Sequence, residues 1–145
     1  MSMTITPDIL IRRWFEELWN QGNEATIDAL MAPDALIHGL PSEGGQVIRG
    51  PAGFRPFFHA FHQAFPDIRV DVVRTITEGD LVAAHCHTIG THQGDTLGFA
   101  GTGRKVDFWG VTIARTKNGM LVEGWNCFDF LTCYLQLGVI TMPGA

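Results

Sequence analysis

The sequence contains few serines, lysines and cysteines, and each shortage argues against a class of chemistry. The only serines, Ser2 and Ser42, lie in no nucleophile elbow, which disfavours a serine hydrolase. The only lysines, Lys105 and Lys117, fall near the ends of predicted strands, where a buried Schiff-base amine is not expected. The 3 cysteines form no CxxC pair and are odd in number, so we expect free thiols rather than a disulfide framework.

The charge and the hydropathy argue against two further kinds of partner. The formal net charge is -5, whereas nucleic-acid binding needs a basic surface, so we expect no nucleic acid as a partner. No run of about 18 apolar residues occurs, so we expect no membrane-spanning helix. The N-terminus lacks the basic and then apolar layout of a signal peptide, which makes the cytoplasm the expected compartment.

The sequence does contain enough apolar residues for a well-packed core. It has 145 residues, 46% of them hydrophobic, and no internal repeat, which predicts a single domain over residues 1–145. In the first half, Thr6 and Asn23 are expected to cap helices, and Pro56 is expected to leave the start of a third helix irregular. The segments predicted there are a helix from Pro7 to Gly22, a short helix from Asn23 to Pro33, a strand over 34–38, a loop over 39–50 and a phenylalanine-rich helix from Pro51 to Pro66.

The second half is predicted to be almost entirely β-structure. Strands are expected over 68–77, 81–92, 105–115 and 120–130, and a short closing helix over 131–137. Asn118-Gly119 has the chemistry of a hairpin turn between the last two strands. Helices followed by long antiparallel strands indicate an α+β fold. Because four long strands twist strongly, we expect a curved sheet that wraps around the helices and leaves a ligand cavity between them.

An ordered set of short motifs supports a more specific interpretation of the fold and of the function. The motifs are Ala64-Phe65-Pro66-Asp67, Glu78-Gly79-Asp80, Gly90-Thr91-His92-Gln93-Gly94, Gly98, Thr102-Gly103-Arg104-Lys105-Val106, Glu123-Gly124-Trp125 and Asp129. In order and spacing the chain resembles the SnoaL-like polyketide cyclases, also called ester cyclases, of the nuclear transport factor 2-like superfamily. The resemblance extends from the first helix to Leu135-Gln136-Leu137-Gly138.

This resemblance implies a fold, a reaction and one catalytic residue. It implies a cone-shaped sheet with a deep pocket, and an intramolecular aldol condensation that uses neither a metal nor an organic cofactor. An aspartate on the last strand is the acid/base of the characterised cyclases, and Asp129 stands at the matching position. The chain departs from the family pattern at Asn126, where many relatives carry an acidic residue, at Cys127, where a bulky aromatic is common, and at Ala100-Gly101, where a proline is frequent.

Asp129 is the leading candidate for a catalytic group. Its sequence neighbours, including Trp125, Phe128 and Phe130, are apolar, and a carboxylate buried among them would lose solvation and gain a raised pKa. Such a group can take a proton from a carbon beside a carbonyl and return it later. The alternative is structural, since an aspartate just before Leu131 can cap the closing helix.

Three histidines are further catalytic candidates. His85 and His87 lie two residues apart on a predicted strand and therefore share a face, and His38 ends a strand before the long loop. If they face the pocket, one of them can hydrogen-bond a substrate oxygen or orient Asp129. The alternative is that they are ordinary polar strand positions. The pair also has a spacing that suits a metal, but no clear third ligand is evident, so we expect no metal.

A group of aromatic residues is expected to bind the substrate, together with one amide. Flat indole and phenyl rings can line a pocket for a ring-shaped or hydrophobic ligand, although core packing is the alternative for each of them. The candidates are Trp14, Phe58, Trp109, Trp125 and Asn126.

Two classes of function therefore remain open. The first is a cofactor-free enzyme that performs an aldol-type ring closure, with an isomerase, dehydratase or epoxide hydrolase as the alternatives on the same fold. The second is a non-catalytic module that binds a small hydrophobic ligand or dimerises. A sheet face left uncovered by helices usually pairs, so we expect a homodimer or homotetramer.

Overall fold

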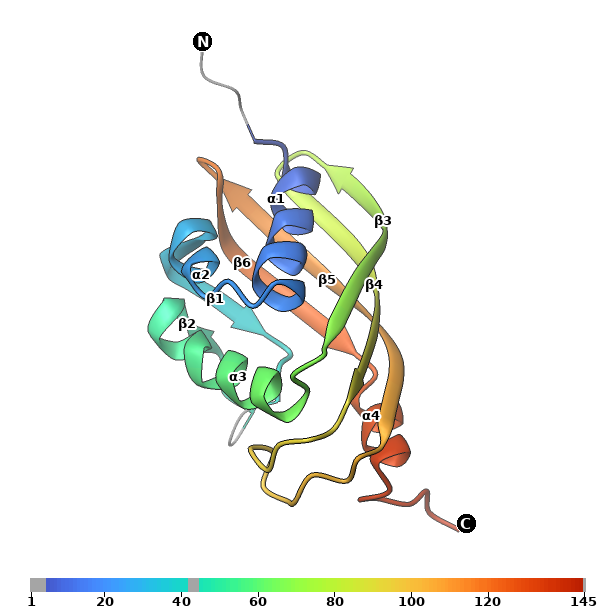
Figure 1. Cartoon of the computed structure of the whole chain (residues 1–145). Coiled ribbons are helices and arrows are strands. Elements are labelled where there is room, and N and C mark those ends of the chain that lie inside the picture. The colour runs from blue at the N-terminus through green and yellow to red at the C-terminus, as the bar shows by residue number, and fades with distance from the viewer. Residues whose placement is uncertain (1–4, 42–44, 145) are drawn as a thin grey trace.

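The helices and the sheet form two layers. The computed structural model describes residues 5–41 and 45–144, so Ser2, Ser42 and part of the loop predicted over 39–50 lie outside the described residues. Figure 1 shows the helices of the first half against one face of a curved sheet. This arrangement confirms the predicted α+β class, with a curved sheet around the N-terminal helices. In the described part of the chain, no helix is both long and apolar enough to cross a membrane.

The helices lie close to their predicted positions. They are α1 (Pro7–Arg13), η1 (Trp14–Asn20), α2 (Ala25–Leu30), α3 (Gly50–Ala64) and α4 (Phe130–Leu137). The segment η1 continues α1 with the wider turns of a π-helix. Thr6 is the N-cap residue of α1, as predicted, although its side chain makes no capping hydrogen bond, whereas the second predicted cap, Asn23, is wrong because Glu24 is the N-cap of α2. Pro56 lies inside a continuous α3, so the predicted irregular start is also wrong.

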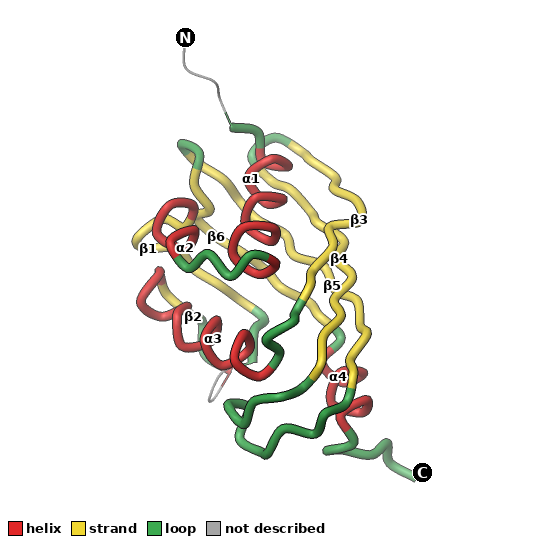
Figure 2. Tube along the Cα trace, viewed as in Figure 1, coloured by secondary structure: helices red, strands yellow, loops and turns green. Residues whose placement is uncertain are grey.

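The sheet has six strands, one more than the five predicted, because β2 lies in the segment expected to be a loop. They are β1 (Met31–His38), β2 (Ile48–Arg49), β3 (Arg69–Glu78), β4 (Leu81–Thr91), β5 (Lys105–Lys117) and β6 (Met120–Phe128). Their order is β2-β1-β6-β5-β4-β3, and Figure 2 shows β1 crossing behind the helices to reach β6. Every neighbouring pair is antiparallel except β1 and β6, which are parallel. The expectation of a purely antiparallel sheet is therefore corrected at that pair.

Alternating burial along the strands defines two faces of the sheet. On β4, the even-numbered residues Val82, Ala84, Cys86 and Thr88 are buried beneath the helices, and we call this the inner face. The side chains between them, such as His85, lie on the opposite, outer face. The register carries both faces across the sheet, because Ala84 pairs with Thr112 of β5 and Thr112 pairs with Asn126 of β6.

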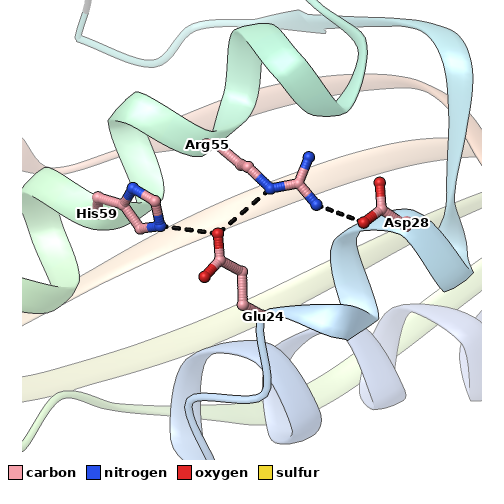
Figure 3. Close-up of polar contacts among 4 residues, drawn as sticks. All are labelled: Glu24, Asp28, Arg55 and His59. Carbon is pink, nitrogen blue, oxygen red and sulfur yellow. Dashed lines mark hydrogen bonds and ion pairs between the residues drawn. The ribbon is translucent and has the colours of Figure 1, made fainter.

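Charged side chains join α3 to the segment that begins α2 (Figure 3). The Glu24 carboxylate accepts hydrogen bonds from Arg55 Nε at 3.2 Å and from His59 Nε2 at 2.7 Å. Arg55 also pairs with Asp28 of α2. The buried residues of α3 lie on its other side, so the charged network is on the side of the helix that faces away from the core.

Candidate functional site

A cavity of about 100 Å³ lies between the inner face of the sheet and the helices. The cavity is narrow, because side chains from many elements converge on it. The helical side is lined by Ile11, Trp14, Phe15, Trp19, Phe54, Phe57, Phe61 and Phe130, and the sheet side by Val70, Thr88, Phe108, Thr112, Ala114, Leu121, Asn126 and Phe128, among others.

Aromatic rings in contact with one another build the walls. The Trp14 and Phe54 ring centroids are 5.3 Å apart, and Phe130 lies 5.7 Å from Phe61 and 6.0 Å from Phe108. The spacing of Phe54, Phe57 and Phe61 places them along one side of α3, which is why that helix supplies much of the wall. Such walls favour flat, unsaturated ligands.

A glycine on the sheet makes room for one of these rings. Gly110 pairs with Phe128 across β5 and β6, and a Cβ added to Gly110 would lie 2.3 Å from the Phe128 ring. The ring therefore covers the backbone of β5 at this point. Any side chain at position 110 would displace the Phe128 ring. Gly110 therefore helps to shape the cavity wall, which includes that ring.

Asn126 is the predicted site residue that the structure places most clearly at the cavity. Its Oδ1 accepts a hydrogen bond from Thr112 Oγ1 at 2.8 Å, and its Nδ2 donates to the backbone oxygen of His38 at 3.0 Å. Gly39, which follows His38, has a φ of +81°, and an added Cβ there would lie 1.9 Å from the backbone oxygen of Asn126, so only glycine lets the two strands approach this closely. The amide keeps a second N–H for a ligand.

A second polar group lies on the inner face at Thr88. The residue is only 2% exposed, and its Oγ1 has no hydrogen-bond partner among the described residues. It borders the cavity beside Phe108, with which it pairs across β4 and β5. A buried hydroxyl without a partner is unusual in a folded protein.

Asp129 occupies a different environment from the one predicted. It precedes α4 as its N-cap, and its carboxylate accepts hydrogen bonds from Thr132 N at 3.0 Å and from Thr132 Oγ1. These hydrogen bonds lower the pKa of Asp129, so the raised pKa expected from its apolar neighbours is wrong. The reason is geometric, because Phe128 and Phe130 turn toward the cavity while Asp129 between them is exposed. Its position matches the structural alternative, a helix cap.

His85, His87 and Trp109 gather on the outer face. The Trp109 ring lies 4.8 Å from His85 and is stacked on His87 at 4.6 Å. His87 Nε2 lies 2.6 Å from Asp107 Oδ1, and His85 Nδ1 is bonded to Arg74. The predicted shared face of the two histidines is thus confirmed, but it is the face turned away from the cavity.

His38 and Trp125 form a second outer-face cluster. Their rings stack with centroids 5.6 Å apart, and His38 Nε2 lies 2.7 Å from the carboxylate of Glu123. Glu123 belongs to β6 at the border of the cavity, two residues before Trp125, so their side chains share the outer face. Of the predicted rings, Trp14 lines the cavity, whereas Phe58 is buried against Trp19 and lies outside the lining.

The described lining is therefore almost free of groups that transfer protons at neutral pH. Among these residues Glu123 alone carries a carboxylate, no histidine is present, and the Glu123 carboxylate is engaged by His38. Within the described residues, no three His, Cys, Asp or Glu side chains gather as a metal site. The polar groups left to act on a ligand are the hydroxyls of Thr88 and Thr112 and the amide of Asn126.

Comparisons with known proteins agree with this fold. The family model described as SnoaL-like polyketide cyclase matches residues 9–137. The chain belongs to the SnoaL-like polyketide cyclase family. No curated protein matches the chain.

Solved structures of the same fold include other members named as SnoaL-like or polyketide cyclases. IdmH from Streptomyces antibioticus, a proposed polyketide cyclase, is 32% identical, with a TM-score of 0.80 over 93% of this chain and 100% of that one. AclR from Streptomyces galilaeus, a proposed hydroxylase, is 24% identical, with a TM-score of 0.80 over 93% and 97%. A protein from Catenulispora acidiphila with a ketosteroid isomerase-like fold is 16% identical, with a TM-score of 0.75 over 96% and 100%, and shows the fold alone.

Sequence reasoning missed Thr88, Thr112, Phe108 and Phe128 in this SnoaL-like cavity. A signal for the first of these exists in the alternation along β4, where small residues, Ala84 and Cys86, precede Thr88 at every second position. The alternation places Thr88 on the face opposite the histidines, but the period alone does not tell which of the two faces meets the helices.

Proposed function

We propose that the chain is a ring-closing enzyme for a slender, conjugated polyketide, and that it acts mainly by holding the substrate folded. The observation that carries this proposal is the cavity itself, which combines aromatic walls with hydroxyl and amide groups. The IdmH likeness supports the substrate class, because that relative is a proposed polyketide cyclase at 32% identity. A small hydrophobic molecule is accordingly the proposed partner.

The substrate can supply the acid and the base for such a closure. In a chain of alternating carbonyls, one β-dicarbonyl unit enolises, and its enol carbon attacks a second carbonyl carbon to form the new C–C bond. The enol O–H proton moves to the oxygen of the attacked carbonyl, which becomes a hydroxyl, so no atom is gained or lost. Holding the two carbons in contact removes much of the entropic barrier of this step.

Asn126 is the group proposed to act on the developing charge. Its second amide N–H is available to the attacked carbonyl, and a preorganised donor in a dry cavity stabilises the charge that builds up there. Its own hydrogen bonds to Thr112 and to the His38 backbone hold the amide in place.

Aldol condensation with Asp129 as the acid/base is the alternative mechanism, and the family resemblance favours it. The environment of Asp129 argues against an acid/base role, because the residue is exposed and hydrogen bonds from Thr132 lower its pKa. A non-catalytic hydrophobic-ligand-binding module is the alternative class.

Turnover of linear polyketide esters by two variants separates these possibilities. Each ester is incubated with the native chain, with Asn126→Leu and with Asp129→Asn, and cyclic product is followed by mass spectrometry. We expect at least a tenfold loss for Asn126→Leu and no loss for Asp129→Asn, which keeps an oxygen for the helix cap. Loss in Asp129→Asn alone would overturn the proposed mechanism in favour of the aspartate. Ligand binding without any product would favour the non-catalytic class.

A further inference from the structure

Thr88 borders the cavity and carries a hydroxyl for which no hydrogen-bond partner appears among the described residues. Its side chain is on the inner face of β4 and is 2% exposed. The neighbours across the sheet on this face are Val70 of β3 and Phe108 of β5, neither of which offers a polar side-chain atom. The residue borders the cavity, so a ligand held there can act as a hydrogen-bond partner for this hydroxyl.

An unused hydroxyl in such a place opposes folding. Removing a hydroxyl from water without giving it a partner is unfavourable, and a valine of nearly the same shape avoids that penalty. The β-branched preference of a strand is met equally well by valine. Packing and strand geometry thus give no reason for the oxygen, whereas a ligand with a hydrogen-bond acceptor does.

We propose that the Thr88 hydroxyl is a ligand-binding group that donates a hydrogen bond to a carbonyl oxygen of a conjugated ligand in the cavity. This inference rests on the proposed binding of a polyketide and specifies where a second carbonyl of that substrate lies. The aromatic residue paired with Thr88, Phe108, is part of the wall, so a ring or enone attached to that carbonyl lies against an aromatic surface.

The position of Thr88 relative to Asn126 sets the length of the substrate. Asn126 pairs with Thr112, and Thr112 is four residues along β5 from Phe108, the partner of Thr88. At about 3.3 Å per residue along a strand and about 4.8 Å between neighbouring strands, the two polar positions, on β4 and β6, are roughly 16 Å apart. Asn126 is half-buried and Thr88 is fully buried, so the carbonyl at Thr88 belongs to the end of the ligand that enters first.

Binding of acetophenone and α-methylstyrene tests the role of Thr88. The two probes have nearly the same shape, but a methylene replaces the carbonyl oxygen in α-methylstyrene, and one ring suits a cavity of about 100 Å³. Affinities are measured by NMR titration of the native chain, Thr88→Val, Thr88→Ser and Thr26→Val. Thr26 is the matched control, because it is also buried with an unpartnered Oγ1 but lies in α2 and outside the cavity lining.

We expect the native chain to prefer the ketone by roughly tenfold, as one buried hydrogen bond allows. Thr88→Val should abolish the preference without lowering the melting temperature, while Thr88→Ser and Thr26→Val should keep it. If Thr88→Val retains the preference, or if the native chain binds both probes equally, the role of Thr88 is overturned while the proposed function stands. If Thr88→Val does not fold, Thr88→Ala takes its place and should lose the preference for acetophenone over α-methylstyrene. Failure of both probes to bind the native chain overturns this inference together with the cavity as a ligand site.

Discussion

The outer and inner faces of the sheet differ in the kinds of side chain they carry, and the ligand cavity lies on the face that the sequence did not favour. The outer face carries the residues that usually suggest chemistry, with His85, His87 and Trp109 in one cluster and His38 beside Trp125 in another. The inner face carries small and aliphatic residues with isolated hydroxyls and one amide. The cavity nevertheless lies on the inner face, so reactive side chains and ligand site are separated by the thickness of a sheet.

This difference shows how a pocket for an apolar ligand is made. Gly110 leaves room above β5 for the Phe128 ring, and rings from α3 and α4 complete the wall of the cavity. A histidine or carboxylate in such a place would need a partner to offset its lost solvation. On the outer face water and the neighbouring charges meet that need, as Asp107 does for His87.

The largest expected contrast between the faces is in stability. Phe108 and Trp109 are consecutive on β5, but Phe108 is 4% exposed and Trp109 is 43% exposed. Phe108→Ala should lower the free energy of unfolding by about 3–5 kcal/mol, because it removes a ring from the cavity wall and leaves a void. Trp109→Ala should lower it by about 1 kcal/mol, since it removes only half-exposed stacking on the histidines. Urea unfolding of both variants measures the contrast, and equal losses would contradict the assignment of the faces.

A smaller change should affect assembly rather than folding. Exposed apolar side chains on the outer face include Ile76 of β3 and Trp109 and Ile113 of β5, the two strands that flank β4. The homodimer or homotetramer expected from the sequence stays a prediction, and we propose that it forms through this face. Mixed charges there, such as Arg74 and Asp107, allow a second copy to pair with the first.

Sedimentation velocity tests that assembly. The native chain should sediment as a dimer or tetramer, and Trp109→Asp should sediment as a monomer with an unchanged circular dichroism spectrum. A native monomer would contradict the prediction. A variant that stays assembled would place the interface elsewhere.

Much of the fold follows from local patterns, and the site does not. Helix and strand positions were predictable because Pro7, Gly22 and Asn118-Gly119 act through their own backbone geometry. The strand β2 has two residues and no periodicity, and the parallel pairing of β1 with β6 joins distant segments, so neither left a local signal.

The errors at the site have two physical causes. Alternation on β4 separates His85 and His87 from Cys86, but nothing local tells which of the two rows faces the helices. At Asp129, apolar neighbours suggested burial, whereas at the junction of β6 and α4 the chain turns and its flanking phenylalanines point elsewhere. Only the tertiary arrangement decides either case.

The smallest expected perturbation is a chemical label, which reports on the faces without changing the fold. Cys86 is buried on the inner face, and desolvation raises the pKa of its thiol to about 12. Cys133 in α4 is also buried, with a thiol pKa raised to about 12. Cys127 is exposed, and its partner across the strands, Val111, belongs to the outer face. Since the thiolate is the nucleophile, a maleimide at pH 8 should modify Cys127 first.

Mass spectrometry of the native and the urea-unfolded chain checks this order. The native chain should gain one label at Cys127, and the unfolded chain should gain three. Cys127→Ser is the control and should leave the native chain unlabelled. Rapid labelling of Cys86 in the native state would mean that the helices leave the inner face often enough to admit the reagent, and the inner face would then be no more protected than the outer one.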